Sequence, residues 1–153
     1  LPKILSGGYE IEDHSRLKIT VDEKEVAQGL NEVIIVPQFA GRLLKYELQI
    51  DGKEIGQEAD DGLIIATPTG SSAHALSAGG PQIKGNAKVF VVVRMNPIDL
   101  NKRPLVINDH SVVKIHKIER PPVQAIVDGQ LDFLAQNQVM VSKGTPVKFV
   151  RPI

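Results

Sequence analysis

Three features of the sequence predict a mainly β fold, a two-sheet sandwich with one or two short helices. Most segments are short and alternate between apolar and polar residues, which is typical of strands that are buried on one face. The 13 glycines and 10 prolines are spread along the chain rather than gathered in one linker. Only one segment has the pattern of a helix. Together these features favour a single β-rich domain over residues 1–153.

The clearest strand is the segment Leu44–Ile50, in which apolar residues alternate with Lys45, Glu47 and Gln49. It ends at Asp51-Gly52, a dipeptide that favours tight turns, and Asp128-Gly129 gives a second hairpin signal. The same reasoning predicts further strands at Leu17–Val21, Glu32–Val36, Leu63–Ala66, Lys88–Arg94, Val112–Ile118, Val123–Val127, Val139–Ser142 and Val147–Val150. The pattern of Glu23–Leu30 fits either a helical turn or a hairpin arm.

The one expected helix covers Ser72–Ala78, which is rich in alanine. Either Ser71 or Ser72 can cap its first turn through a side-chain oxygen. The run Gly79-Gly80-Pro81 should end it, because these residues favour helix termination.

The composition excludes several classes of protein. Lys+Arg and Asp+Glu both number 18, so the balanced charge predicts neither nucleic acid nor an anionic membrane as a partner. No cysteine is present, which excludes disulfide scaffolds and thiolate chemistry and fits a cytoplasmic protein. The longest apolar run, Val89–Val93, is far shorter than the ~20 residues of a membrane span. The chain begins at Leu1, which suggests a piece of a longer protein.

The most unusual stretch runs from Asp60 to Pro81, where an apolar strand enters a turn of small residues and then a helix start. Such a turn can present backbone N–H groups and hydroxyls to a phosphate or a ribose. A cluster of Ser, Thr, Gly and Pro is also an ordinary loop with a helix cap. Local chemistry alone leaves both interpretations open.

The same stretch resembles the signature of the NAD kinase family. The similarity lies in Asp61-Gly62-Leu63, in the turn from Thr67 to His74 (Thr-Pro-Thr-Gly-Ser-Ser-Ala-His), and in Ser77-Ala78-Gly79-Gly80-Pro81. Three shorter elements resemble family motifs in the same order, namely Leu30-Asn31-Glu32-Val33, Arg103-Pro104-Leu105-Val106 and Val127-Asp128-Gly129-Gln130. The resemblance therefore covers nearly the whole chain.

The resemblance implies the C-terminal domain of the NAD kinase fold. In that family ATP, or polyphosphate in some members, phosphorylates the 2′-hydroxyl of the adenosine ribose of NAD to give NADP. A divalent cation such as Mg²⁺ accompanies ATP, and the proteins are homodimers or homotetramers. The family's N-terminal α/β domain, with its Gly-Gly-Asp-Gly motif, is absent from this chain. No residue of this chain is therefore expected to be catalytic, and we expect the isolated chain to be inactive.

The resemblance also implies which residues contact NAD. Carried over by motif, they are Asn31, Glu32, Asp61, Thr67, Ser72, Ala73, His74, Ser77 and Asp128. Two positions depart from the family pattern, because Ser72 replaces a Thr and His74 replaces a Tyr. An imidazole covers less ring area than a phenol and changes its charge near neutral pH. Without the motifs, Asp61 and Asp128 would be ordinary turn carboxylates, and Asn31-Glu32 a solvent-facing strand start.

No metal site is expected from the sequence. The four histidines do not fall into a ligand spacing such as His-x-x-x-His, and His116 is expected to face solvent beside Lys114. Two other functional classes stay open. One is a related lipid kinase, such as a diacylglycerol or sphingosine kinase; the other is a non-catalytic β-domain that binds a nucleotide or mediates oligomerisation.

Overall fold

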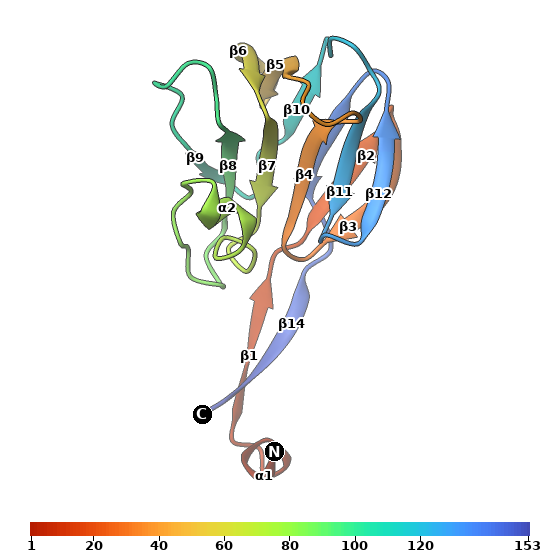
Figure 1. Cartoon of the computed structure of the whole chain (residues 1–153). Helices are drawn as coiled ribbons and strands as arrows, with labels where there is room; N and C mark the ends of the chain where they lie inside the picture. The colour runs from red at the N-terminus through yellow and green to blue at the C-terminus, as the bar shows by residue number, and fades with distance from the viewer.

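A computed structural model describes all residues 1–153 and contains two six-stranded antiparallel sheets (Figure 1). The first sheet has the order β3 (Lys24–Gly29), β2 (Leu17–Val21), β13 (Val139–Lys143), β10 (Val113–His116), β5 (Leu44–Ile50), β6 (Lys53–Asp60). The second has the order β12 (Leu131–Ala135), β11 (Val123–Val127), β4 (Glu32–Pro37), β7 (Gly62–Ala66), β8 (Val89–Met95), β9 (Leu105–Asn108). The predicted two-sheet, mainly β fold is confirmed.

The two sheets pack face to face over one apolar core of 20 buried residues. Every second residue of a strand points inward, so Ile19 and Leu48 of the first sheet meet Ile65 and Phe90 of the second in the same cluster. Removing this apolar surface from water is the main term that stabilises the sandwich. Val, Ile and Leu dominate because the chain has few aromatic residues.

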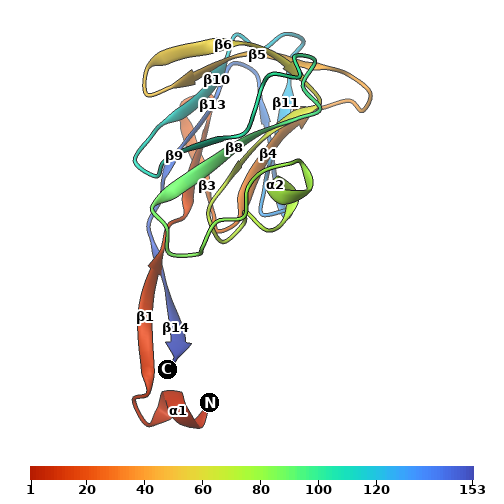
Figure 2. The same ribbon diagram turned by 90° about the vertical axis from the view of Figure 1, so that its left-hand side faces the viewer.

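The second sheet is also covered on part of its outer face. Helix α2 (His74–Ser77) lies against β7 and β8, and both views show it on the side away from the first sheet (Figures 1 and 2). A second, smaller cluster of buried residues forms there, made of Ile64, Ala66, Ala75, Val91 and Val93. Burial on both faces explains why β7 and β8 are continuous apolar runs rather than alternating ones.

A two-stranded ribbon extends from one end of the sandwich. Strand β1 (Tyr9–His14) pairs with β14 (Val147–Pro152), and helix α1 (Pro2–Leu5) lies at its far end beside both termini (Figure 2). Neither helix of the structure has the length and apolar character needed to cross a bilayer.

The nine strands expected from alternation are all present, three with the expected ends and six with ends shifted by one or two residues. The ambiguous segment Glu23–Leu30 is a hairpin arm, strand β3. Asp22 and Glu23 turn the chain with φ of 47° and 70°, and the Asp22 carboxylate accepts backbone N–H groups of residues 136–138. Four strands were not expected, namely β1, β6, β9 and β12. In β6 a bulge near Gly56 breaks the alternation that reveals a strand in sequence.

The predicted helix Ser72–Ala78 is too long. Helix α2 has only four residues, and Ala73 stands at its N-cap without a side-chain hydrogen bond. Neither expected serine caps it. The Ser71 hydroxyl is buried and instead donates to the carbonyl of Pro68 at 2.7 Å. It also accepts the N–H of Ile83 at 2.9 Å, so tertiary contacts take the group that would have capped the helix.

Candidate functional site

The signature segment supplies strand β7 of the second sheet and then covers part of that sheet's outer face. Strand β7 leads into a turn over residues 67–73, and α2 returns across the sheet (Figure 1). A pocket of about 290 Å³ lies between α2 and the strands. Its lining combines apolar and polar side chains from four segments: Ile34, Ile64, His74, Ser77, Ala78, Met95 and Asn96. Two of the predicted NAD-binding residues, His74 and Ser77, therefore line one pocket.

A buried carboxylate stands behind His74. Glu32, the first residue of β4, is 3% exposed, and its Oε1 lies 2.7 Å from Nδ1 of His74. Because a carboxylate only accepts, Nδ1 carries the proton of this hydrogen bond and Nε2 stays available. Oε2 of Glu32 is buried and has no hydrogen-bond partner. Asp60 and Asp109 also have one buried oxygen without a partner, but only Glu32 is bonded to a residue that lines this pocket, where a ligand hydroxyl can satisfy its free oxygen.

Asp61 joins the same pocket through a neighbour. Its Oδ2 accepts a hydrogen bond from Nδ2 of Asn96 at 2.9 Å, and Asn96 lines the pocket. Asp61 is exposed, and it also borders a hollow of about 530 Å³ beneath the β4–β5 loop. In that loop the guanidinium of Arg42 lies 4.9 Å from the ring centroid of Phe39. Asp61 thus stands at the boundary between two concave regions.

Thr67 holds the signature turn in place instead of facing the pocket. Its side chain is fully buried, and the hydroxyl donates to the carbonyl of Leu30 at 2.6 Å and accepts the N–H of Gly70 at 3.1 Å. A Cβ on Gly70 would collide with the backbone of Asn31, so only glycine permits this approach. The turn and the start of β4 are therefore locked together.

The turn does not offer the row of free donors that the sequence suggested. The backbone N–H groups of Gly70, Ser71 and Ala73 all bond within the turn. The hydroxyl of Thr69 lies 3.0 Å from Nδ1 of His14. The bonded amides and the single-turn length of α2 weaken the case for a phosphate site made of backbone N–H groups and a helix dipole.

Asp128 also supports the site from below. Its carboxylate accepts the N–H groups of Leu30 at 2.8 Å, Asn31 at 2.7 Å and Glu32 at 3.2 Å. The residue has φ of 52°, as expected for Asp at the start of a tight Asp-Gly hairpin turn. Both carboxylate oxygens are occupied, so in this structure Asp128 positions Asn31 and Glu32.

The three remaining predicted residues lie around the pocket. Ser72 and Ala73 are exposed on the turn that leads into α2. Asn31 is half-buried; its backbone carbonyl accepts the N–H of Thr67 at 2.9 Å, and its side-chain amide has no protein partner. None of the three lines the 290 Å³ pocket directly.

The sequence did not reveal Met95 and Asn96 as pocket residues. Asn96 follows the apolar run of β8 and precedes Pro97, with φ of 46°. Asn in an Asn-Pro step after a buried strand is a turn signal, but nothing in the sequence places it beside Asp61. The pairing of β8 with β7 places Gly62 opposite Met95, and this register brings Asn96 beside Asp61.

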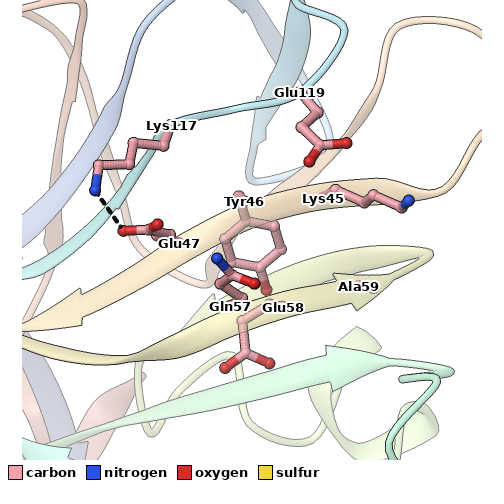
Figure 3. Close-up of a pocket in the computed structure, with 8 residues that line it drawn as sticks. All are labelled: Lys45, Tyr46, Glu47, Gln57, Glu58, Ala59, Lys117 and Glu119. Atoms are coloured by element: carbon pink, nitrogen blue, oxygen red, sulfur yellow. Dashed lines mark ion pairs between the residues drawn. The ribbon is translucent and has the colours of Figure 1, made fainter.

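A hollow of about 460 Å³ lies elsewhere, on the first sheet (Figure 3). Its outer rim carries Lys45, Glu47, Lys117 and Glu119, of mixed charge. Volume alone would favour this hollow over the 290 Å³ pocket. We assign the site to the smaller pocket because only there do several residues of the signature segment converge on a buried, unpartnered carboxylate.

A second buried charge cluster lies between the two sheets. Glu58 of β6 accepts two hydrogen bonds from the Arg94 guanidinium, at 2.7 and 3.0 Å, and one from Lys102 at 3.2 Å. Beside it Tyr46 donates to Oδ2 of Asp60 at 2.9 Å. Burial raises the pKa of Asp60 to about 7; the Tyr46 hydrogen bond opposes the rise, and the Glu58 charge adds to it.

The fold and the pocket define a class: a β-sandwich domain that presents a small pocket of mixed apolar and polar lining on one outer face. The family described as "ATP-NAD kinase C-terminal domain" matches residues 30–151, and the chain belongs to this family. An NAD kinase from Methanopyrus kandleri is 31% identical over 150 residues, which cover 97% of this chain and 54% of that protein.

Two solved structures share the fold. An NAD kinase from Archaeoglobus fulgidus in complex with ATP has a TM-score of 0.82 at 23% identity, covering 94% of this chain and 56% of its own. Yeast NADH kinase complexed with NADH has a TM-score of 0.88 at 23% identity, covering 99% and 47%. The chain spans about half the length of the relatives that it matches.

Proposed function

We propose that this chain is the NAD-binding part of an NAD kinase, which phosphorylates the 2′-hydroxyl of the adenosine ribose of NAD to give NADP. Family membership supports the assignment. The observation that carries it is the buried, unpartnered Oε2 of Glu32 behind His74, in a pocket built by the signature segment. A ribose hydroxyl that donates to this oxygen would remove the cost of leaving it unpaired.

The predicted residues divide into two groups in this proposal. Glu32, Asp61, His74 and Ser77 contact the dinucleotide from the pocket, with Asn31, Ser72 and Ala73 at its edge. The supporting group, Thr67 and Asp128, keeps the turn and the start of β4 in register through the hydrogen bonds described above. His74 gives less ring area for stacking than the Tyr typical of the family, and Nε2 adds a polar contact in return.

The phosphoryl donor, ATP or polyphosphate, belongs to the part of the enzyme that this chain lacks. The carboxylates at the pocket do not meet as a ligand group for a divalent cation: Oε2 of Glu32 is free but buried, Asp61 is exposed and accepts from Asn96, and neither belongs to a group of three side chains close enough to share an ion. Mg²⁺ usually takes one or two carboxylates together with substrate phosphates. The pocket residues do not fit such a site by themselves, and no step through the cation is assigned to this chain.

Isothermal titration of the chain with NAD, NADP and a diacylglycerol tests the proposal. We expect NAD and NADP to bind and Glu32→Gln to weaken NAD at least about tenfold, because the amide turns an acceptor oxygen into a donor. Glu119→Gln is the matched control, since Glu119 is exposed on the other sheet. Binding of diacylglycerol alone would favour a lipid kinase. Binding of none would favour a structural module.

The isolated chain should form no NADP, because phosphoryl transfer depends on positioned donor phosphates and metal.

We further propose a cytoplasmic homo-oligomer. Apolar side chains of β12 and of the β4–β5 loop are exposed, Leu131 at 50%, Leu134 at 49% and Phe39 at 56%, which suits association with a second copy. A sedimentation experiment that finds only monomer at high concentration would count against the oligomer.

A further inference from the structure

Three metal-ligating side chains meet on the outer face of the first sheet, away from the pocket assigned to NAD. They are Glu47 on β5, Glu54 on β6 and His116 on β10, and their ligand atoms all lie within 4.8 Å of one another. Nε2 of His116 is 2.8 Å from Oε1 of Glu54 and 3.9 Å from Oε2 of Glu47. The imidazole is held in place, since its side chain is only 18% exposed.

Contacts within the protein leave this cluster incomplete. Nε2 of a neutral imidazole offers a single proton or a single lone pair. It reaches Glu54, whereas Glu47 lies beyond hydrogen-bond distance. Glu47 is paired instead with Lys117 at 3.0 Å, an ion pair drawn in Figure 3, and Lys117 is 67% exposed. Two carboxylates thus converge on one ring nitrogen. Oε1 of Glu54 also accepts a hydrogen bond from Nε2 of Gln49 at 3.1 Å, so each carboxylate has a second partner.

We propose that Glu47, Glu54 and His116 bind a divalent transition-metal cation of the zinc class. One imidazole nitrogen and two carboxylate oxygens suit Zn²⁺, which binds such ligands at about 2.0–2.2 Å and usually takes four ligands. The three side chains supply three of the four zinc ligands, and a water molecule supplies the fourth on the side that faces solvent. Small side-chain movements bring atoms already within 4.8 Å to the spacing of a tetrahedral site.

The spacing of the histidines in the sequence did not predict this site. The donors come from three neighbouring strands in the order β10–β5–β6, and only strand pairing places His116 opposite Glu47. Lys117 acts as a competitor, because its ammonium occupies the oxygen of Glu47 that the cation requires. Removing that ammonium should strengthen metal binding, and loss of binding on removal of a single ligand separates a built site from an association of zinc with scattered surface carboxylates.

Titration of the metal-free chain with ZnCl₂ by isothermal calorimetry at neutral pH tests the proposal. We expect one zinc per chain, and a loss of affinity of at least about tenfold in His116→Ala and in Glu54→Gln, since each removes a ligand. Lys117→Met should bind zinc several-fold more tightly than the unmodified chain. Circular dichroism of each variant without metal reports whether it is folded.

His110→Ala is the matched control, because His110 is exposed at 77% and has only Asp109 near it, at 3.8 Å. It should leave zinc affinity unchanged. The proposal is overturned if the chain binds no zinc, if His116→Ala binds as well as the unmodified chain, or if His110→Ala loses as much affinity. Weaker binding in Lys117→Met would also overturn it. NAD titrations with and without zinc should agree, because the two sites lie on different sheets.

Discussion

Two buried glutamates of this domain have nearly the same exposure and opposite surroundings. Glu58 lies between the sheets, and both of its oxygens are bonded, by Arg94 and Lys102. Glu32 lies on the outer face of the second sheet, where one oxygen is bonded to His74 and the other to nothing. Arg94 is itself buried at 3% side-chain exposure, whereas His74 is open to solvent at 61%.

The difference separates a charge whose hydrogen bonds are all made inside the fold from one with an oxygen left free for the ligand that we propose. A buried ion pair with all its hydrogen bonds made is tolerated because Coulomb attraction offsets desolvation. A half-satisfied carboxylate is a cost to stability that a binding site can justify. Burial alone therefore does not identify a candidate ligand-binding carboxylate. An unpartnered oxygen is not sufficient either, because Oδ1 of Asp60 and Oδ1 of Asp109 also lack a partner; Glu32 differs from them because it is bonded to His74, which lines the pocket of the signature segment.

The largest loss of stability should come from removing Arg94, the main hydrogen-bond donor to the buried Glu58. Arg94→Met leaves Glu58 as an uncompensated buried charge, and we expect the free energy of unfolding to fall by about 3–5 kcal/mol. Urea denaturation measures this. Lys102→Met is the matched control: Lys102 is 26% exposed and makes one bond to Glu58, so its loss should cost far less. Equal losses in the two variants would show that Arg94 is not the principal partner.

The second-largest effect is the dependence of stability on pH that Asp60 should cause. The folded-state pKa of Asp60, about 7, lies above its unfolded value of about 3.9, so between these values the folded state binds more protons. Its stabilising contribution is complete below about pH 4 and is lost as pH rises through about 7, by up to about 4 kcal/mol. Asp60→Asn keeps the shape of the neutral acid and should flatten this loss.

Urea denaturation at pH 5 and pH 8 checks the Asp60 prediction in both proteins. Asp22 gives the contrast: burial acts to raise its pKa, but the backbone N–H groups of residues 136–138 outweigh burial and lower it. Its contribution is therefore present above the unfolded pKa and is lost only at more acidic pH. Asp22→Asn should leave the difference between pH 5 and pH 8 unchanged. If Asp60→Asn keeps the full difference, another group is responsible.

The smallest loss of stability should come from replacing Asp128, which holds the backbone at the start of β4. Asp128→Ala removes the acceptor of the N–H groups of Leu30, Asn31 and Glu32, and we expect a loss of about 1–3 kcal/mol in stability. NAD affinity should also fall, because Glu32 is no longer held. Asp132→Ala is the control, since Asp132 is exposed and accepts one bond from Gln124. Lost stability with unchanged NAD affinity would mean that Asp128 supports the fold only.

Much of the fold could be predicted because alternation is a local property. Leu44–Ile50 shows its buried and exposed faces in the order of its residues, and the structure confirms the strand. β6 could not be found this way, because a bulge breaks its period and two of its inward residues, Glu58 and Asp60, are charged. Charged residues usually face solvent, and here Arg94 of the other sheet binds Glu58 while Tyr46 of the neighbouring strand binds Asp60.

The location of the candidate pocket could be predicted in part, whereas the set of residues that contact NAD stays a prediction. The signature segment from Asp61 to Ser77 indicated the region, because its residues are consecutive and their types are distinctive, and His74 and Ser77 line the pocket. The division between residues that line the pocket and residues that support the turn was not predictable. Thr67 and Asp128 are polar residues of a motif, and only their hydrogen bonds to the strand start at Leu30 show that they brace it.

The sequence by itself determined the strand-rich sandwich, the position of the signature turn and the family resemblance, since each depends on residues close together in the chain. The tertiary structure alone decided which carboxylates are satisfied, that α2 is one turn long, and that Glu47, Glu54 and His116 meet. The physical reason is that these features depend on strand register between distant segments. Register fixes which side chains share a face, and local pattern does not encode it.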